Sequence, residues 1–148
     1  MRILILGIVL FVTGCGFKAK VPDYVDPEFR PYVNDYLIDK ERYTGRYGLD
    51  RNINVVFKPL NENGSAKRLL GQCLMWSDNR KRYIHIDPIY WYKILGEAGK
   101  EALIYHEMGH CDLDLDHTNH GIMVPSGLRE DDYILNREQY LEELFRSR

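Results

Sequence analysis

The sequence predicts a small α+β domain in which helices flank a mixed sheet of a few strands. Three observations lead to this fold class. The chain has 148 residues, which suits one domain with a single core. Short runs with strand character occupy the middle of the chain. Helical patterns stand on both sides of these runs, at about 27–42, 99–112 and 136–145.

The first helix is predicted from Asp26-Pro27 to about Arg42. Asp26 can cap this helix, and Pro27 suits its first position. Its apolar residues recur at helical spacing: Phe29, Val33, Tyr36 and Leu37. Gly45 then ends the pattern.

Three segments are predicted to be strands: Ile53–Phe57, Leu70–Trp76 and Arg82–Asp87. The third segment alternates strictly between polar and apolar residues. Pro88 follows it, and this combination favours an edge strand. A peptide substrate can add to such an edge through its free backbone groups. His85 on this strand is expected to be an ordinary side chain rather than a metal ligand.

Three helices are predicted in the second half of the chain. A short one covers Ile89–Leu95, and a longer one runs from about Gly99 to Asp112. The last covers about 136–145, where Asn136 and Gln139 have capping-box spacing.

Composition excludes several classes of protein. Lys and Arg total 20 against 22 Asp and Glu, so no basic excess points to nucleic acid as a partner. With 12% aromatic and 45% hydrophobic residues, the chain can support a core, which argues against disorder. Three cysteines are too few for a disulfide scaffold.

The N-terminus has the pattern of a secretory signal. Arg2 precedes the apolar run Ile3–Val12, which is far shorter than the roughly 20 residues of a membrane-spanning helix. The stretch Val12-Thr13-Gly14-Cys15 resembles the lipobox of bacterial lipoproteins, in which an aliphatic residue and two small ones precede a cysteine.

This resemblance implies a lipoprotein signal peptide over 1–14, a lipidated N-terminus and tether over 15–26, and a domain over 27–148. Cys15 would carry acyl chains such as palmitate, and several chains together give stable anchoring in a bilayer. Gly16, rather than Asp, follows the cysteine. In Gram-negative bacteria this resembles sorting to the outer membrane, so we expect a cell-envelope protein on its periplasmic face.

The strongest motif is His106-Glu107-Met108-Gly109-His110, inside the predicted helix. His106 and His110 lie four residues apart and share one face, where neutral imidazoles suit zinc. Glu107 lies about 100° around the helix, beside the metal, where its carboxylate can take a proton from a zinc-bound water. Gly109 is costly in mid-helix, which indicates close approach by other backbone.

With the later Gly121-Ile122-Met123, this segment resembles the metzincin class of zinc metallopeptidases. In that class the zinc helix ends at a glycine, a third His lies six residues past the second, and a methionine turn lies under the metal. His106, Glu107 and His110 match residue by residue. Met123 resembles the methionine of that turn.

The third ligand departs from the family pattern. Leu113 stands where the glycine should be, and Asp116 lies six residues past the second His, with His117 one further. In one alternative the loop carries an extra residue, so that His117 binds and Asp114 takes the left-handed turn. In the other Asp116 binds, as in a small subgroup of metzincin-like secreted proteases. We favour His117, because imidazole is the commoner zinc ligand in such sites.

Other site hypotheses deserve a test. His120 is a lesser choice for the third ligand, and a thermolysin-like site would use Glu130. The alternating acids Asp112, Asp114 and Asp116 resemble the start of a calcium loop, but the glycine and glutamate required later are missing.

Near the site, Pro125 replaces a tyrosine that some metzincin groups use to hold the transition state. Tyr133 is a possible substitute, although a packed aromatic is the more common role. Cys73 and Cys111 can pair in an oxidising compartment, or Cys111 can remain a free thiol beside the ligand helix.

The sequence therefore predicts a membrane-anchored zinc-dependent hydrolase, a metallopeptidase resembling a minimal metzincin. Zn2+ would be held by His106, His110 and His117, with Glu107 as the general base that cleaves a peptide or protein substrate. The alternative hypothesis is an envelope lipoprotein with structural zinc, or a catalytically degenerate binding module. Glu107 argues against this alternative, because a structural site has no use for a carboxylate there.

Overall fold

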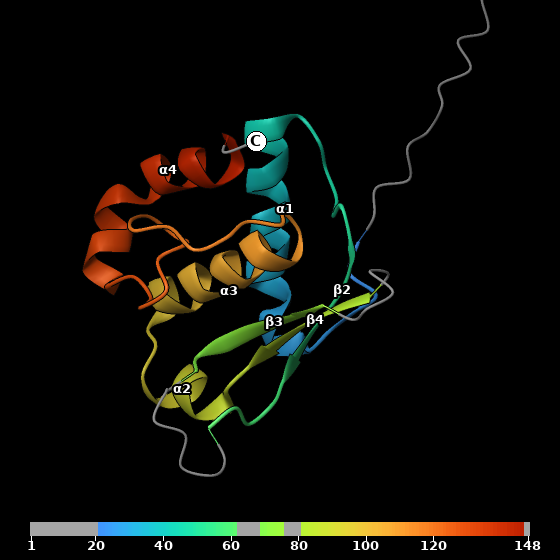
Figure 1. The fold of residues 1–148 in the computed structure, drawn as a ribbon, viewed down its shortest axis with the longest axis vertical. Helices are drawn as coiled ribbons and strands as arrows, with labels where there is room; N and C mark the ends of the chain where they lie inside the picture. Colours follow the sequence, from blue (N-terminus) through green and yellow to red (C-terminus); the bar gives the residue numbers. More distant parts are fainter. Residues whose placement is uncertain (1–20, 62–68, 76–80, 147–148) are drawn as a thin grey trace, which may run out of the picture.

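A mixed sheet with helices packed against it confirms the predicted α+β class (Figure 1). The computed structural model describes residues 21–61, 69–75 and 81–146. In chain order the elements are strand β1 (Tyr24–Val25), 3-10 helix η1 (Pro27–Phe29), helix α1 (Arg30–Thr44), strands β2 (Asn52–Phe57), β3 (Gly71–Met75) and β4 (Lys81–Ile86), and helices α2 (Pro88–Lys93), α3 (Glu97–Cys111) and α4 (Glu130–Arg146).

The predicted signal peptide, Cys15 and the first half of the predicted tether lie outside the described residues, as does Trp76 at the end of the second predicted strand. In the part of the chain that is described, no helix combines the length and the apolar character needed to cross a membrane.

The sheet has the strand order β1-β2-β4-β3. Strand β2 pairs in parallel with both β1 and β4, whereas β3 pairs with β4 in the antiparallel sense. The prediction that Arg82–Asp87 forms an edge strand is therefore wrong, because β4 lies inside the sheet. Pro88 is the first residue of α2, beyond the ladder, so it removes no hydrogen bond from β4. Among the described strands, β3 forms the edge beside β4.

Asp26 stands at the N-cap position before Pro27, as predicted, but its side chain joins the first strand to the sheet and does not cap the helix. No side-chain hydrogen bond from Asp26 caps η1. Its carboxylate accepts the backbone N–H of Phe57 at 2.9 Å and the hydroxyl of Tyr24 at 2.7 Å. The helix that follows ends at Gly45, whose φ of 70° gives the left-handed cap that glycine adopts readily.

The last helix begins at Glu130, six residues before the predicted start. Its first turn carries three acids, which favour a helix N-terminus, but its apolar Ile134 and Leu135 are exposed. The apolar pattern in the sequence therefore identifies only the later turns of α4. Asn136 lies inside the helix and donates a hydrogen bond to the carbonyl of Asp132 at 3.1 Å, so it is not a cap.

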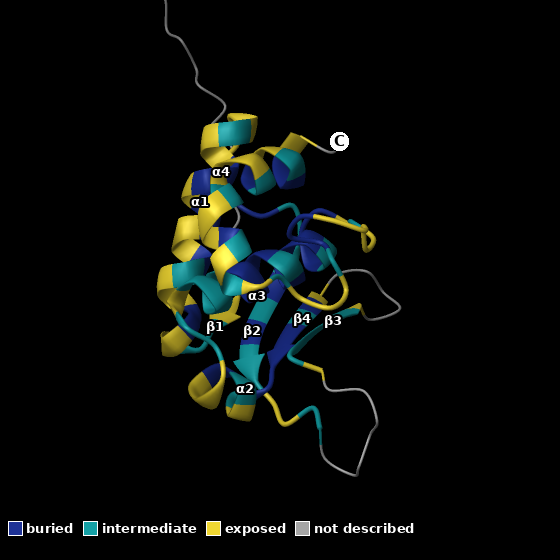
Figure 2. Ribbon diagram, turned by 90° about the vertical axis from the view of Figure 1, so that its left-hand side faces the viewer, coloured by how far each residue is buried: buried dark blue, intermediate teal, exposed yellow. Residues whose placement is uncertain are grey.

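The core lies between the sheet and α3, and Figure 2 shows the buried residues on their facing surfaces. Helix α3 packs against β3 and β4, and it also contacts α1 and α4. Arg137 of α4 ties the three helices together through Asp39 of α1 at 2.8 Å and Glu101 of α3 at 2.6 Å.

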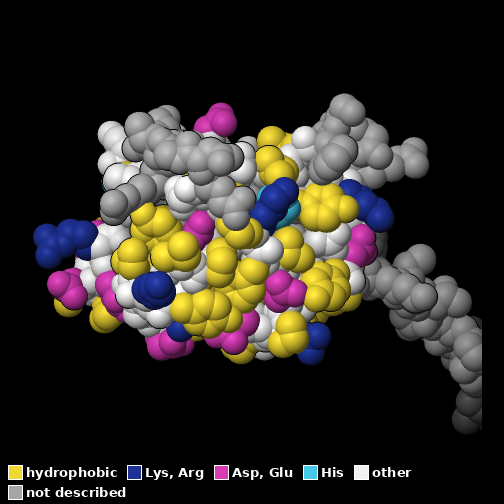
Figure 3. Space-filling view, turned by 90° about the horizontal axis from the view of Figure 1, so that it is seen from below, with side chains coloured by type: hydrophobic (Ala, Val, Ile, Leu, Met, Phe, Trp, Pro, Cys, Tyr) yellow, Lys and Arg dark blue, Asp and Glu magenta, His cyan; other side chains and the backbone are white. Residues whose placement is uncertain are grey.

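Apolar side chains also gather on the surface around α2. Ile89, Tyr92 and Ile94 are more than half exposed. Figure 3 shows hydrophobic side chains on this face with acidic side chains among them. This surface patch lies outside the core that supports α3.

Asp87 links the end of β4 to α2. Its carboxylate accepts hydrogen bonds from the backbone amides of Ile89 and Tyr90 at the helix N-terminus. The Leu60 amide and the Asn61 side chain donate to it from the other side. Burial alone would raise the pKa of Asp87, but these four hydrogen bonds outweigh it and hold the pKa below its ordinary value of 3.8.

We expect Asp87→Asn to destabilise the protein near neutral pH by about 1–2 kcal/mol, and this difference to shrink in acid. The contribution of a carboxylate with a lowered pKa is complete above pH 3.8 and is lost as the pH falls through its folded-state pKa. Urea denaturation at several pH values measures it, with Asp35→Asn, at an exposed position, as the control. A destabilisation that stays constant down to pH 2 would contradict this assignment.

Candidate metal centre

Helix α3 carries the first two histidines, and its other end is fixed by α4. Glu130, at the start of α4, accepts hydrogen bonds from the amides of Ala98 and Gly99 in the first turn of α3. This carboxylate caps the helix N-terminus, where negative charge is favourable. His110 lies near the opposite end of α3, so Glu130 is not the third ligand, and the thermolysin-like hypothesis is wrong.

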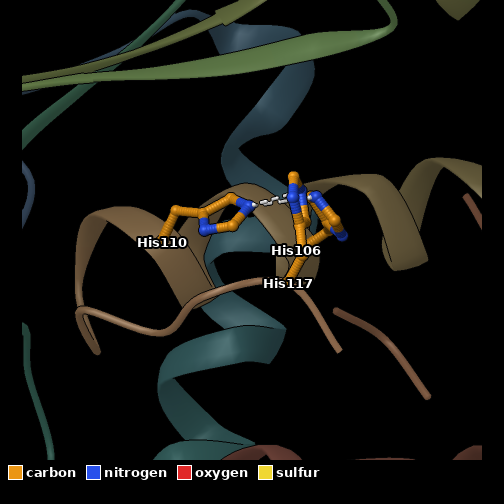
Figure 4. Close-up of side chains that lie close together, drawn as sticks. All are labelled: His106, His110 and His117. Atoms are coloured by element: carbon orange, nitrogen blue, oxygen red, sulfur yellow. Dashed lines mark hydrogen bonds between the residues drawn. The ribbon is translucent and has the colours of Figure 1, made fainter. Parts of the chain in front are cut away.

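Three imidazoles converge at the carboxyl-terminal end of α3. His110 Nε2 lies 3.2 Å from His106 Nε2 and 3.1 Å from His117 Nε2. Figure 4 shows His110 pointing toward the other two rings, with His117 contributed by the loop after the helix. These residues form the one group of potential metal ligands found among the described residues. Asp116 and His120 do not belong to it.

Backbone carbonyls orient two of the rings. His106 Nδ1 lies 2.7 Å from the carbonyl oxygen of Ile122, and His110 Nδ1 lies 2.6 Å from that of Leu115. A carbonyl only accepts hydrogen bonds, so each Nδ1 carries the proton and donates it. Each Nε2 then presents a lone pair toward the same point, as metal-ligating histidines do.

The donor set fits a zinc ion. Nitrogen ligands 2.0–2.1 Å from a tetrahedral zinc ion would lie roughly 3.4 Å from one another. The Nε2 atom of His110 lies at similar distances, 3.2 and 3.1 Å, from the Nε2 atoms of His106 and His117. Burial lowers the pKa of His106 to about 4 and also lowers that of His110, with neighbouring imidazoles adding to the shift. Both rings are therefore neutral near pH 7, as ligation requires.

The loop after α3 has the conformation predicted for one extra residue. Asp114 has φ of 57°, the left-handed conformation, and the loop brings His117 rather than Asp116 to the other histidines. The carboxylate of Asp114 pairs with Arg82 and Arg51.

The first of the three alternating acids, Asp112, also binds other side chains of the protein. It pairs with Lys40 at 2.6 Å and accepts the hydroxyl of Tyr36 at 3.0 Å. Since Asp112 and Asp114 both neutralise protein cations, the calcium-loop interpretation is wrong.

Glu107 is buried between α3 and the edge strand β3. Only 4% of the residue is exposed, and its carboxylate packs so closely on Gly71 that a Cβ there would lie 2.6 Å from its Oε1. Burial raises the pKa of Glu107 to about 8, although a hydrogen bond from the Cys73 backbone N–H works in the opposite direction. A carboxyl group with a pKa in this range exchanges its proton close to neutral pH, which suits a group that both takes up and releases a proton.

Met123 supports the helix from below the site. An added Cβ at Gly109 would lie only 2.3 Å from Met123 Sδ and 3.3 Å from Leu144 Cδ1. The close approach predicted at Gly109 is therefore real, but a side chain makes it rather than backbone. Met123 is almost fully buried and is not itself among the candidate ligands.

Cys73 and Cys111 form a disulfide, which settles the two alternatives left open by the sequence. Their Cα atoms are 5.6 Å apart, and the bond joins β3 to the last residue of α3. The linkage fixes the end of the helix, immediately after His110, to the edge strand.

The three histidines and Glu107 line a cleft of about 550 Å³. Apolar side chains, among them Leu95, Leu103 and Leu128, line other parts of the cleft, together with Pro125. Tyr133 is not among its lining residues and is buried, with its hydroxyl on Glu101 at 2.9 Å. It packs in the protein and does not replace the tyrosine that some metzincin groups use.

Several contributors to this site could not be read from the sequence. Ile122 and Leu115 act through their carbonyl oxygens, which every residue type has. Gly71 acts by lacking a side chain, and only the pairing of β3 with β4 brings it to Glu107. His85 lies on β4, nearly buried, and does not join the group.

Comparison of the sequence and fold with models of protein families, with curated proteins and with solved structures finds no match.

Replacing Gly109 with Ala should destabilise the protein by about 1–3 kcal/mol, because the new methyl group would overlap Met123. In a Met123→Ala background the same substitution should cost less, since the sulfur atom is gone. Denaturation of the two single variants and the double variant measures this coupling. Simple additivity of the two costs would show that the contact is unimportant.

Metal affinity distinguishes the two proposed third ligands. His117→Ala should weaken zinc binding by more than the roughly 10–100-fold that follows loss of a group hydrogen-bonded to a metal ligand, because one of three nitrogen ligands is removed. Asp116→Asn should change it by less than about tenfold. Competition with a chromophoric chelator measures both, and the opposite ranking would assign the ligand to Asp116.

Proposed function

We propose that this protein is a membrane-anchored zinc-dependent hydrolase, and specifically a metallopeptidase. The observation that carries the proposal is that Glu107, a buried carboxylate, and three convergent imidazoles line the same cleft. A zinc site that only stabilised the fold would be closed by a fourth protein ligand. Among the described residues, no fourth ligand joins these three histidines.

Each residue of the site has a defined task in this proposal. The Nε2 atoms of His106, His110 and His117 would hold the zinc ion. When bound, zinc supplies Lewis acidity for the scissile carbonyl and makes a water molecule acidic enough to lose a proton near pH 7. Glu107 accepts that proton on a carboxylate oxygen and later donates it to the leaving amine. Burial of Glu107 keeps bulk water from this proton.

The edge strand β3 supports a peptide as the substrate. The N–H of Asp87 donates to the carbonyl of Leu70 at 2.9 Å, so the backbone N–H and C=O groups of every second residue, counted from Leu70, point toward β4. Gly71, Cys73 and Met75 therefore direct their backbone groups away from β4, and the Cys73 N–H already donates to Glu107. Gly71 and Cys73 also line the cleft. An extended peptide placed along this edge would run past Glu107, which moves the proposed substrate strand from β4 to β3.

The disulfide supports a location outside the cytosol, because such bonds persist in oxidising compartments. This agrees with the proposed anchoring through Cys15 in a bacterial envelope. The lipobox resemblance remains the basis for the anchor itself.

Glu107→Gln should retain zinc and abolish hydrolysis. Glutamine keeps the size of the side chain and an acceptor for the Cys73 amide, but it cannot take up a proton. The measurements are zinc content and cleavage of unfolded casein by the full-length protein. Loss of the general base alone should reduce turnover by about 10²–10⁴-fold.

The control is Glu138→Gln, an exposed carboxylate paired with Arg42 on the surface, which should change neither zinc content nor cleavage. Full activity of Glu107→Gln would refute the assigned role. Zinc bound stoichiometrically, with no cleavage of casein or of peptide libraries, would instead favour an envelope lipoprotein with a structural metal site.

A further inference from the structure

We propose that Asp114, clamped by Arg82 and Arg51, is a positioning residue that sets the geometry of the metal centre. We call these three residues the Asp114 clamp. The inference rests on the proposed zinc site and concerns how the loop with the third ligand is held. It assigns a function to a departure from the metzincin pattern, the acidic residue at a turn where glycine is expected.

The first observation is the conformation of Asp114. It is the only non-glycine residue with positive φ among the described residues. Left-handed conformations are disfavoured for residues with a Cβ atom, although Asp and Asn tolerate them better than most. The side chain therefore provides something that glycine, which adopts this turn freely, would not provide.

The second observation is how the side chain is held. Arg82 Nη1 donates to one carboxylate oxygen of Asp114, and Arg51 Nη2 lies 2.6 Å from the other. The Arg82 side chain is only 5% exposed and reaches the loop from β4. The same Nη1 also donates to the carbonyl of Cys111 at 2.8 Å. One buried guanidinium thus fixes both the end of α3 and the turn that follows it.

The third observation links this turn to the metal ligands. Leu115, directly after Asp114, donates its N–H to the carbonyl of Gly109 at 3.0 Å. Its own carbonyl accepts the Nδ1–H of His110 at 2.6 Å. A change in the backbone at Asp114 would therefore move the acceptor that orients His110, and it would displace His117 three residues later.

Charge explains why the clamp would be specific. Arg82 is buried, and Asp114 supplies the carboxylate of its ion pair. A buried cation that loses its anion is strongly unfavourable, so the loop position with Asp114 on Arg82 is selected against alternatives. Arg51 is 40% exposed, and its pair with Asp114 is worth less because solvent screens it.

The decisive variant is Asp114→Asn, which keeps the size of the side chain and its tolerance of the left-handed turn but removes the charge. We expect the zinc dissociation constant to rise about 10–100-fold. The visible spectrum of the Co2+-substituted protein should also change, because it reports ligand geometry. Asp35→Asn removes one charge at an exposed position and should match the wild type in both measurements.

Two arginine variants compare how much Arg82 and Arg51 each contribute to the Asp114 clamp. Arg82→Lys keeps the charge, but lysine is shorter and does not bring a nitrogen to the position of Nη1, which donates to both the Asp114 carboxylate and the Cys111 carbonyl. This variant should therefore weaken zinc binding about as much as Asp114→Asn. Arg51→Gln should weaken it by less than about fivefold, because this pair is partly exposed. Equal or reversed effects of the two arginine variants would overturn the clamp as described.

A metal-free measurement separates this proposal from the proposed function. In the wild-type apoprotein, NMR of the imidazole nitrogens should show the proton of His110 on Nδ1, and Asp114→Asn should mix the two tautomers. An unchanged tautomer overturns the clamp, whether or not zinc binds. Failure of the wild-type protein to bind zinc would overturn the proposed hydrolase but not the clamp. If Asp114→Asn only lowers the stability of the protein, while the tautomer of His110 and the cobalt spectrum stay as in the wild type, then Asp114 has a purely structural role. This result would also overturn the proposal.

Discussion

The site depends on how the second half of α3 is fixed to the sheet. The Cys73–Cys111 bond joins the helix end to β3, and Glu107 fits against Gly71 two residues earlier on the same strand. Arg82 reaches the same helix end from β4. A helix free to slide or rotate would move Glu107 away from Gly71, and it would carry His106 and His110 away from His117 on the loop. Covalent, steric and ionic contacts together remove that freedom.

Three acids in alternate positions after α3 have three different environments. Asp112 is fully buried on Lys40, Asp114 is exposed but held between two arginines, and Asp116 is exposed on the loop that carries His117. Buried ion pairs are expensive to desolvate and add little net stability, but a lost partner is costly. Such pairs therefore favour one arrangement of the loop over others, which is what a metal ligand on a loop requires.

Much of the site was predictable because its signals are local. Spacing alone places His106 and His110 on one helical face, and the extra residue after α3 predicted both His117 and the left-handed turn at Asp114. The strand order was not predictable, because local alternation does not show which strand pairs with which, and Arg82–Asp87 was wrongly placed at the edge. The prediction of a capping side chain at Asp26 is wrong, since the short β1 that this residue secures has almost no pattern. The sequence pattern does not show the start of α4, because the apolar residues Ile134 and Leu135 in its first turns are exposed.

The position of β1 has a mechanical consequence. The strand order places β1 and β3 at opposite sides of the described sheet, with β2 and β4 between them. If the chain is anchored through Cys15, as proposed, tension from the membrane enters the domain at β1. The parallel pairing with β2 and the Asp26 carboxylate on Phe57 would bear that load first. Strand β3 lies beyond β2 and β4, and Glu107 of α3 packs against it. Under such anchoring the cleft would be separated by two strands from tension on the tether.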